Sequence, residues 1–158
     1  MALREIRTIG DEILHKASKP VEEITDKTRQ LLDDMLQTMH HVGGIGLAAV
    51  QVGVLRRILV IDTGEEDFTP IEAINPQVIH NEGNQTDWEG CLSIPDQRGL
   101  VDRPMVTVIK AQNRHGEEFE LRAEGRLAVV LNHELDHLDG VLYIDKATEI
   151  NDLDDDED

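Results

Sequence analysis

The residues best able to do chemistry lie in the segment 132–140, which reads NHELDHLDG. His133 and His137 are four positions apart, so on a helix their side chains lie one turn apart on the same face. Two imidazoles in this arrangement can bind one divalent metal ion, and Glu134 can reach a water molecule on that ion. The pattern HExxH therefore predicts metal-assisted hydrolysis, with Glu134 as the general base.

The same pattern can also arise by chance on a solvated helix face, since the chain has seven histidines. The preceding residues, 127–131, favour the metal site because they are all apolar. A helix that is apolar on every side is buried on several of them. Polar side chains on a buried helix need partners, and a metal ion would satisfy both imidazoles.

A catalytic metal site usually needs a third protein ligand and an open position. The extended pattern HExxHxxGxxH fails here because Tyr143 stands at its last position. Glu149 follows in a charged stretch and is a poor candidate. The single cysteine, Cys91, lies upstream between Gly90 and a run that ends in Pro95. A lone cysteine is commonly a small core residue, but a thiolate with two imidazoles is an established ligand set for zinc or ferrous iron.

The composition limits the class of protein. The 158 residues fit one domain, and 39% hydrophobic with 30% charged residues is typical of soluble globular chains. We expect no membrane span and no signal peptide. The formal net charge of −18 opposes direct binding to nucleic acid or to an anionic membrane. One cysteine allows no intramolecular disulfide and indicates a reducing compartment, the cytoplasm.

The elements that must position these groups can be read from periodicity. Apolar residues at helical spacing over 31–39 predict an amphipathic helix after Thr25, its N-cap. The β-branched run 57–62 predicts a buried strand. Further strands are expected over 71–80 with a break at Pro76, over 105–111 and over 118–121, with a turn at 113–116. Short strands followed by a late helix predict an α+β domain. We expect it to span 1–147, followed by a disordered acidic tail over 148–158.

The glycine-rich segment 43–53 lacks the lysine of a phosphate-binding P-loop. Its small residues allow close backbone approach instead, as when an extended substrate lies alongside. Gln51 is the one polar side chain in this segment. It is either a buried amide with internal partners or a hydrogen-bond donor aimed into a site.

Three segments together resemble the motifs of the peptide deformylase family: GIGLAAVQ at 44–51, EGCLSIP at 89–95 and HELDHLDG at 133–140. The resemblance runs from Ile6 to Asp145. It implies removal of the formyl group from the N-terminal formyl-methionine of newly made polypeptides, with release of formate. The family's fold, antiparallel β-sheets packed around a central HExxH-bearing helix, agrees with the α+β prediction and its N-terminal amphipathic helix.

The resemblance also implies a role for each matching residue. The implied metal ligands are Cys91, His133 and His137. Glu134 would be the general acid and base, and Gln51 with the backbone N–H of Leu92 would stabilise the oxyanion. The implied metal is Fe(II) natively, with nickel or cobalt able to replace it and zinc often less active. The ligand set alone permits all four.

The implied substrate-binding residues come from two motifs and from the helix. Backbone groups around Ile45, Gly46 and Gly90 would pair with the extended N-formyl-methionyl peptide. Ile45, Val129 and Val130 are candidates for the apolar pocket that takes the methionine side chain.

Glu89 and Arg103 either pair to support the metal site from outside or form an ordinary surface ion pair.

The chain departs from the family pattern in several places. Asn132 stands where glutamine is common, Gly43 adds a glycine, and Arg126 occupies a position on the pocket rim that is more often apolar. We expect these changes to affect substrate preference and not the metal chemistry. Many bacterial members dock on the ribosome through a basic C-terminal helix, whereas an acidic tail soon follows Lys146 here. That tail makes ribosome docking by this route doubtful.

Two other functions would use the same helix. A metallopeptidase would cleave internal peptide bonds and ignore formylated peptides, and an inactive metal-binding domain would turn over nothing. Formate release from formyl-Met-Ala-Ser, with and without a chelator, separates the three possibilities.

Overall fold

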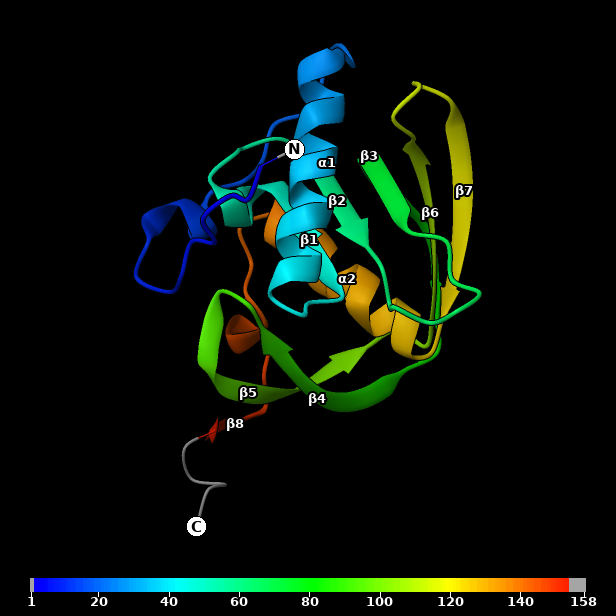
Figure 1. The fold of residues 1–158 in the computed structure, drawn as a ribbon. Helices are drawn as coiled ribbons and strands as arrows, with labels where there is room; N and C mark the ends of the chain where they lie inside the picture. Colours follow the sequence, from blue (N-terminus) through cyan, green and yellow to red (C-terminus); the bar gives the residue numbers. More distant parts are fainter. Residues whose placement is uncertain (1, 154–158) are drawn as a thin grey trace.

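The computed structural model describes residues 2–153 as an α+β fold of two antiparallel β-sheets and two α-helices (Figure 1). The predicted α+β class with antiparallel sheets is confirmed. The larger sheet has the strand order β1-β2-β3-β6-β7, and the smaller has the order β4-β5-β8. Helix α2 runs between them in Figure 1 and contacts strands of both.

The elements have the following bounds. The strands of the larger sheet are β1 (Gly46–Ala48), β2 (Ile58–Ile61), β3 (Ile71–Glu82), β6 (Val106–Gln112) and β7 (Glu118–Glu124). The strands of the smaller sheet are β4 (Gln85–Cys91), β5 (Ile94–Arg103) and β8 (Glu149–Asp152). The helices are α1 (Asp26–His41) and α2 (Arg126–Leu138), with short 3-10 helices η1 (Glu12–His15), η2 (Ala49–Val52) and η3 (Tyr143–Asp145). No helix of residues 2–153 is long and apolar enough to cross a membrane.

The core of the larger sheet lies around β2, which forms within the β-branched run predicted as a strand. Its four residues are buried, and it pairs with β1 on one side and β3 on the other. Helix α1 covers one face through Leu32, Met35 and Met39, which are fully buried. Helix α2 covers the other with Leu131 and Leu135. The apolar stretch ahead of HExxH is therefore buried, which holds the motif firmly against the sheet.

The predicted break at Pro76 is found as an irregularity in the pairing of β3 with β6, and the strand itself continues to Glu82. The pairing of β3 with β6 shifts register between Ile74 and Gln77, as at a β-bulge. A proline has no N–H to donate, and a bulge leaves its position outside the ladder. Asn75 has a positive φ of 54°, and its side-chain amide bonds both backbone groups of Val21, at 2.7 and 2.9 Å.

The hairpin of β4 and β5 was not predicted as strands. Its segment is partly exposed and interrupted by glycines and a proline, so the apolar alternation that marks a strand is absent. The two strands pair from Gln85↔Arg103 to Cys91↔Ile94. Cys91 therefore lies at the last residue of β4, at the turn.

The predicted boundary at 147, with a disordered tail from 148, is wrong for residues 149–152. These form β8, which pairs with β5 from Leu100↔Glu149 to Gln97↔Asp152. The pairing uses backbone groups, so acidic side chains that face solvent do not prevent it. The rest of the predicted tail, residues 154–158, lies outside the described part of the chain.

Candidate metal centre

Three potential metal ligands meet between the hairpin and α2. The ligand atoms of Cys91, His133 and His137 all lie within 4.8 Å of one another. Cys91 Sγ is 3.3 Å from His137 Nε2, and the two imidazole rings are 5.0 Å apart between centroids. The helix sets the spacing of the histidines, and the β4–β5 turn brings the sulfur to them. The sequence-predicted ligand set is thus gathered at one point.

The surroundings of His133 suit metal binding. The Glu89 carboxylate accepts a hydrogen bond from His133 Nδ1–H at 2.9 Å, so Nε2 is the ring nitrogen that remains to bind an ion. His133 is buried, and the ring of Tyr143 stacks on it with centroids 5.9 Å apart. One sulfur and two imidazole nitrogens make a donor set that fits zinc, ferrous iron, nickel or cobalt.

A buried ion pair holds Glu89 in place. Arg103 donates two hydrogen bonds to it, both of 2.8 Å, and a third of 2.6 Å to Asp136. Burial raises the pKa of Glu89, but the bonds from Arg103 and His133 outweigh it and lower the pKa to about 2. Through Glu89, the Glu89–Arg103 pair holds the His133 ring in position. The interpretation of this pair as an ordinary surface ion pair is wrong, because both side chains are buried.

The charges around the two histidines favour a cation between them. Burial lowers the pKa of His137 to about 3, so its imidazole is neutral, the form that binds a metal. Burial also acts to lower the pKa of His133, but the Cys91 sulfur and the Glu89 carboxylate outweigh it and raise that pKa well above its ordinary value. The groups that attract a proton to His133 also favour a metal ion among the ligand atoms.

Glu134 lies beside the ligands with one oxygen free. Its Oε1 is buried and has no hydrogen-bond partner within residues 2–153. Burial raises the pKa of Glu134 to about 7, which suits a group that must both accept and donate a proton. A Cβ on Gly46 would lie 2.6 Å from Glu134 Oε2, so a larger residue there would displace the carboxylate. The glycine therefore lets the backbone of β1 pass directly over the carboxylate.

Gln51 has internal partners and also reaches the centre. Its Oε1 accepts a hydrogen bond from the Ala48 N–H at 2.9 Å. Its Nε2 donates to Ser93 Oγ at 3.1 Å and lies 3.6 Å from Cys91 Sγ. Both interpretations of this residue therefore apply: the amide is anchored on one side and presents its N–H groups to the site on the other.

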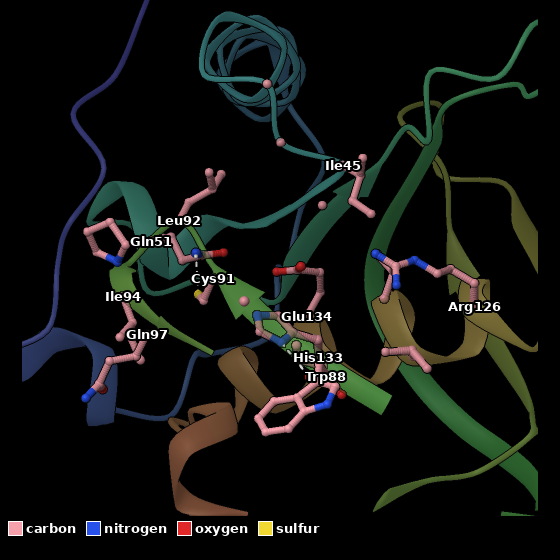
Figure 2. Close-up of a pocket in the computed structure, with 18 of the residues that line it drawn as sticks. Ile45, Gln51, Trp88, Cys91, Leu92, Ile94, Gln97, Arg126, His133 and Glu134 are labelled. Carbon is pink, nitrogen blue, oxygen red and sulfur yellow. Dashed lines mark hydrogen bonds and ion pairs between the residues drawn. The ribbon is translucent and has the colours of Figure 1, made fainter. Parts of the chain in front are cut away.

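A pocket of about 560 Å³ opens beside these groups. In Figure 2, Gln51, Leu92 and Cys91 lie on one side of it, His133 and Glu134 in the middle, and Arg126 on the other side. All five predicted substrate-binding residues line the pocket: Ile45, Gly46, Gly90, Val129 and Val130. A hollow with an apolar wall therefore adjoins the metal centre, and two of the three ligands, Cys91 and His133, line it.

Several contributors to the site were missed from the sequence. Trp88, Gln97 and Leu153 line the pocket. Leu153 fell within the predicted tail, and no periodicity pointed to the other two. Ser93 and Asp136 lie inside the quoted motifs EGCLSIP and HELDHLDG, so proximity to the ligands in sequence was a signal that could have found them.

Comparisons with known proteins agree with this geometry. A family model described as polypeptide deformylase matches residues 3–152. The peptide deformylase of Lachnoclostridium phytofermentans is 53% identical over 93% of this chain and 90% of its own length. The peptide deformylase of Caldicellulosiruptor bescii is 56% identical over 93% of this chain and 87% of its own length. The crystal structure of a peptide deformylase from Legionella pneumophila superposes with a TM-score of 0.90 at 39% identity, covering 93% of this chain and 87% of that one. The crystal structure of a peptide deformylase from Synechococcus elongatus in complex with actinonin superposes with a TM-score of 0.89 at 38% identity. It covers 92% of this chain and 81% of that one.

Proposed function

The chain belongs to the polypeptide deformylase family, and we propose how its own residues carry out the family's reaction. This reaction is the hydrolytic removal of the formyl group from nascent polypeptides, with release of formate. The observation that carries our proposal is the meeting of Cys91 with His133 and His137 beside the free oxygen of Glu134. Helix α2 bears three of these four groups and contacts strands of both sheets. We infer that the fold serves to hold these groups together.

We propose that Cys91, His133 and His137 hold a divalent metal, natively Fe(II), with zinc, nickel or cobalt as replacements. Support comes from the donor set, which fits all four ions, and from the Glu89 carboxylate that fixes the tautomer of His133. When bound, such an ion would act as a Lewis acid, polarising the formyl carbonyl and making water a better nucleophile.

The proton transfers fall to Glu134. Its carboxylate takes a proton from the attacking water and delivers it to the amine that leaves, so that formate and a free N-terminus result. Its burial and a pKa of about 7 support both halves of this role. The absence of a side chain at Gly46 leaves room for this carboxylate.

The developing oxyanion is stabilised by two N–H donors, which lie on the side of the pocket opposite Arg126 (Figure 2). One is the Gln51 amide, which Ala48 and Ser93 already orient. The other is the backbone N–H of Leu92, in the β4–β5 turn directly after Cys91. Donors that are fixed before the reaction need no reorganisation during it, which is the source of their effect on rate.

The substrate lies as an extended strand between the two sheets. β1 and β4 each have a single hydrogen-bonded neighbour among the described strands, so each has a free edge, and Gly46 and Gly90 lie on those edges. Backbone groups there can pair with a peptide by strand addition. The methionine side chain then enters the apolar wall of Ile45, Val129 and Val130.

We propose a cytoplasmic enzyme whose partners are formylated nascent peptides and whose segment after Lys146 is poorly suited to docking on the ribosome. Residues 149–152 form a strand, and the acidic residues that follow them in the sequence would repel RNA.

The test is formate release from formyl-Met-Ala-Ser by the metal-loaded protein. We expect turnover that a chelator abolishes and that added Fe(II) restores, with no cleavage of an internal peptide bond in an unformylated control peptide. Cleavage of the control would indicate a metallopeptidase. Metal binding without formate release would indicate an inactive metal-binding domain.

A further inference from the structure

A single cationic side chain stands at the mouth of the pocket. Arg126 is the first residue of α2, and among the described residues it is the only lysine or arginine that lines the pocket. Its side chain is 67% exposed, and its ion pair with Asp87 Oδ2, at 3.8 Å, is longer than a hydrogen bond. In Figure 2 its guanidinium is turned toward the pocket, from the side opposite Gln51. A substrate carboxylate could therefore reach it.

The helix orders the groups that a bound peptide would meet. His133 lies at the proposed reacting centre, Val129 and Val130 come one turn earlier, and Arg126 a further turn earlier on the same face. One turn rises about 5.4 Å. In an extended peptide alternate side chains point to the same side, with a repeat of about 7 Å. With methionine against the valines, the side chain of the third residue points to the α2 wall next to Arg126.

We propose that Arg126 makes the enzyme favour formylated peptides whose third residue is aspartate or glutamate. This proposal rests on the proposed function and on the placement of the methionine side chain given there. The other charged groups of the pocket do not cancel it: Glu89 is neutralised by Arg103, and Glu134 lies at the inner end of the pocket. Without a local cation, the net charge of −18 would act against acidic substrates.

The experiment measures kcat/KM for two peptides, formyl-Met-Ala-Glu and formyl-Met-Ala-Gln, both with amidated C-termini so that no terminal carboxylate competes. We expect the glutamate peptide to be favoured about two- to fivefold at low salt, the range of an exposed ion pair. Salt at about 1 M should bring the ratio close to one. The same pair of residues at the second position, which points away from α2, should give a smaller ratio.

Variants locate the effect. Arg126→Gln should reduce the ratio to about one, and Arg126→Glu should reverse it and favour a lysine peptide. The matched control is Arg122→Gln on β7, which makes the same change in net charge at a residue outside the pocket, and there the ratio should persist. Comparing ratios within each variant cancels any change in overall turnover.

An unchanged ratio in Arg126→Gln, or an equal fall in Arg122→Gln, would overturn the inference. Hydrolysis of the glutamine peptide with a wild-type ratio of one would overturn it while leaving deformylation intact. If neither peptide released formate, the proposed function would fail and this inference with it.

Discussion

The inner end of the pocket and its mouth are built on opposite principles. At the inner end, Glu89 and Arg103 are almost fully buried, and each is held by at least two hydrogen bonds. At the mouth, Arg126 is largely exposed and has only a loose ion pair. Chemistry needs groups fixed within a fraction of an ångström, whereas recognition of varied peptides needs groups that can adapt. Substitutions at the inner end should therefore abolish function, and those at the mouth should redirect it.

The largest effect should come from Glu134→Gln. This change replaces the proposed proton carrier by an amide of the same size, so kcat should fall about 10²- to 10⁴-fold. Metal content, measured by elemental analysis, should be unchanged because Glu134 is not among the three ligand residues. The exposed Glu120→Gln on β7 is the control and should behave as wild type. Full activity of Glu134→Gln would refute the proposed role.

Arg103→Met tests whether the inner end depends on its buried ion pair. Removing the guanidinium takes three hydrogen bonds away from Glu89, which keeps its bond to His133, and from Asp136, which keeps its ion pair with Lys146. The loss of a buried partner should lower the free energy of unfolding by about 3–5 kcal/mol. Urea denaturation with and without chelator separates lost metal from lost packing. Arg122→Met, at an exposed site, should change stability by less than about 0.5 kcal/mol. Equal losses in both variants would show that burial has no special effect here.

Gln51→Ala removes one proposed oxyanion donor. We expect kcat to fall about 10²- to 10³-fold while the metal is retained. Gln51→Glu keeps an oxygen that can accept from the Ala48 N–H and loses the amide donor, so it should be nearly as slow as Gln51→Ala. If Gln51→Glu were as active as wild type, the amide N–H would have no catalytic role.

Asp34 on α1 provides a buried carboxylate away from the site. Burial acts to raise its pKa, but hydrogen bonds from the Ala2 N–H, the Gln30 amide and Arg4 outweigh it and lower the pKa below its ordinary value. The stability it contributes is therefore present above its unfolded pKa of about 3.9 and is lost as pH falls through the lower folded value.

The comparison is made with Asp34→Asn. The difference in free energy of unfolding between wild type and this variant should be constant from about pH 5 to 7 and shrink below about pH 4. Urea titrations at each pH measure it. A difference that stays constant down to about pH 3 would contradict the assignment.

How well a feature can be predicted from the sequence depends on how far apart in the chain the residues that determine it lie. The spacing of His133, Glu134 and His137 is fixed within little more than one helical turn, so the pattern alone suggested their chemistry. Cys91 could be chosen as a ligand for its thiolate, but its position depends on the pairing of β4 with β5, which no local pattern encoded. The sequence also left open whether Glu89 and Arg103 pair in the interior or on the surface, because burial is a property of the whole fold.

The strands differ in the same way between those with a local sequence signal and those without one. The buried run 57–62 was predicted because burial leaves an apolar signature, whereas β4, β5 and β8 are partly exposed and leave none. β8 in particular looked like solvated tail because its side chains are acidic, yet its backbone completes the smaller sheet. Composition describes side chains, and strand pairing is made by the backbone.

The free edges of β1 and β4 have a consequence for handling the protein. The unpaired N–H and C=O groups to which we assign the substrate can equally join two copies of the chain edge to edge, which is the usual start of aggregation. The enzyme cannot cover these edges and keep the proposed substrate site open. Its large negative charge supplies the protection instead, since like-charged copies repel one another. Concentrated stocks should therefore stay clear longer in dilute buffer than in strong salt.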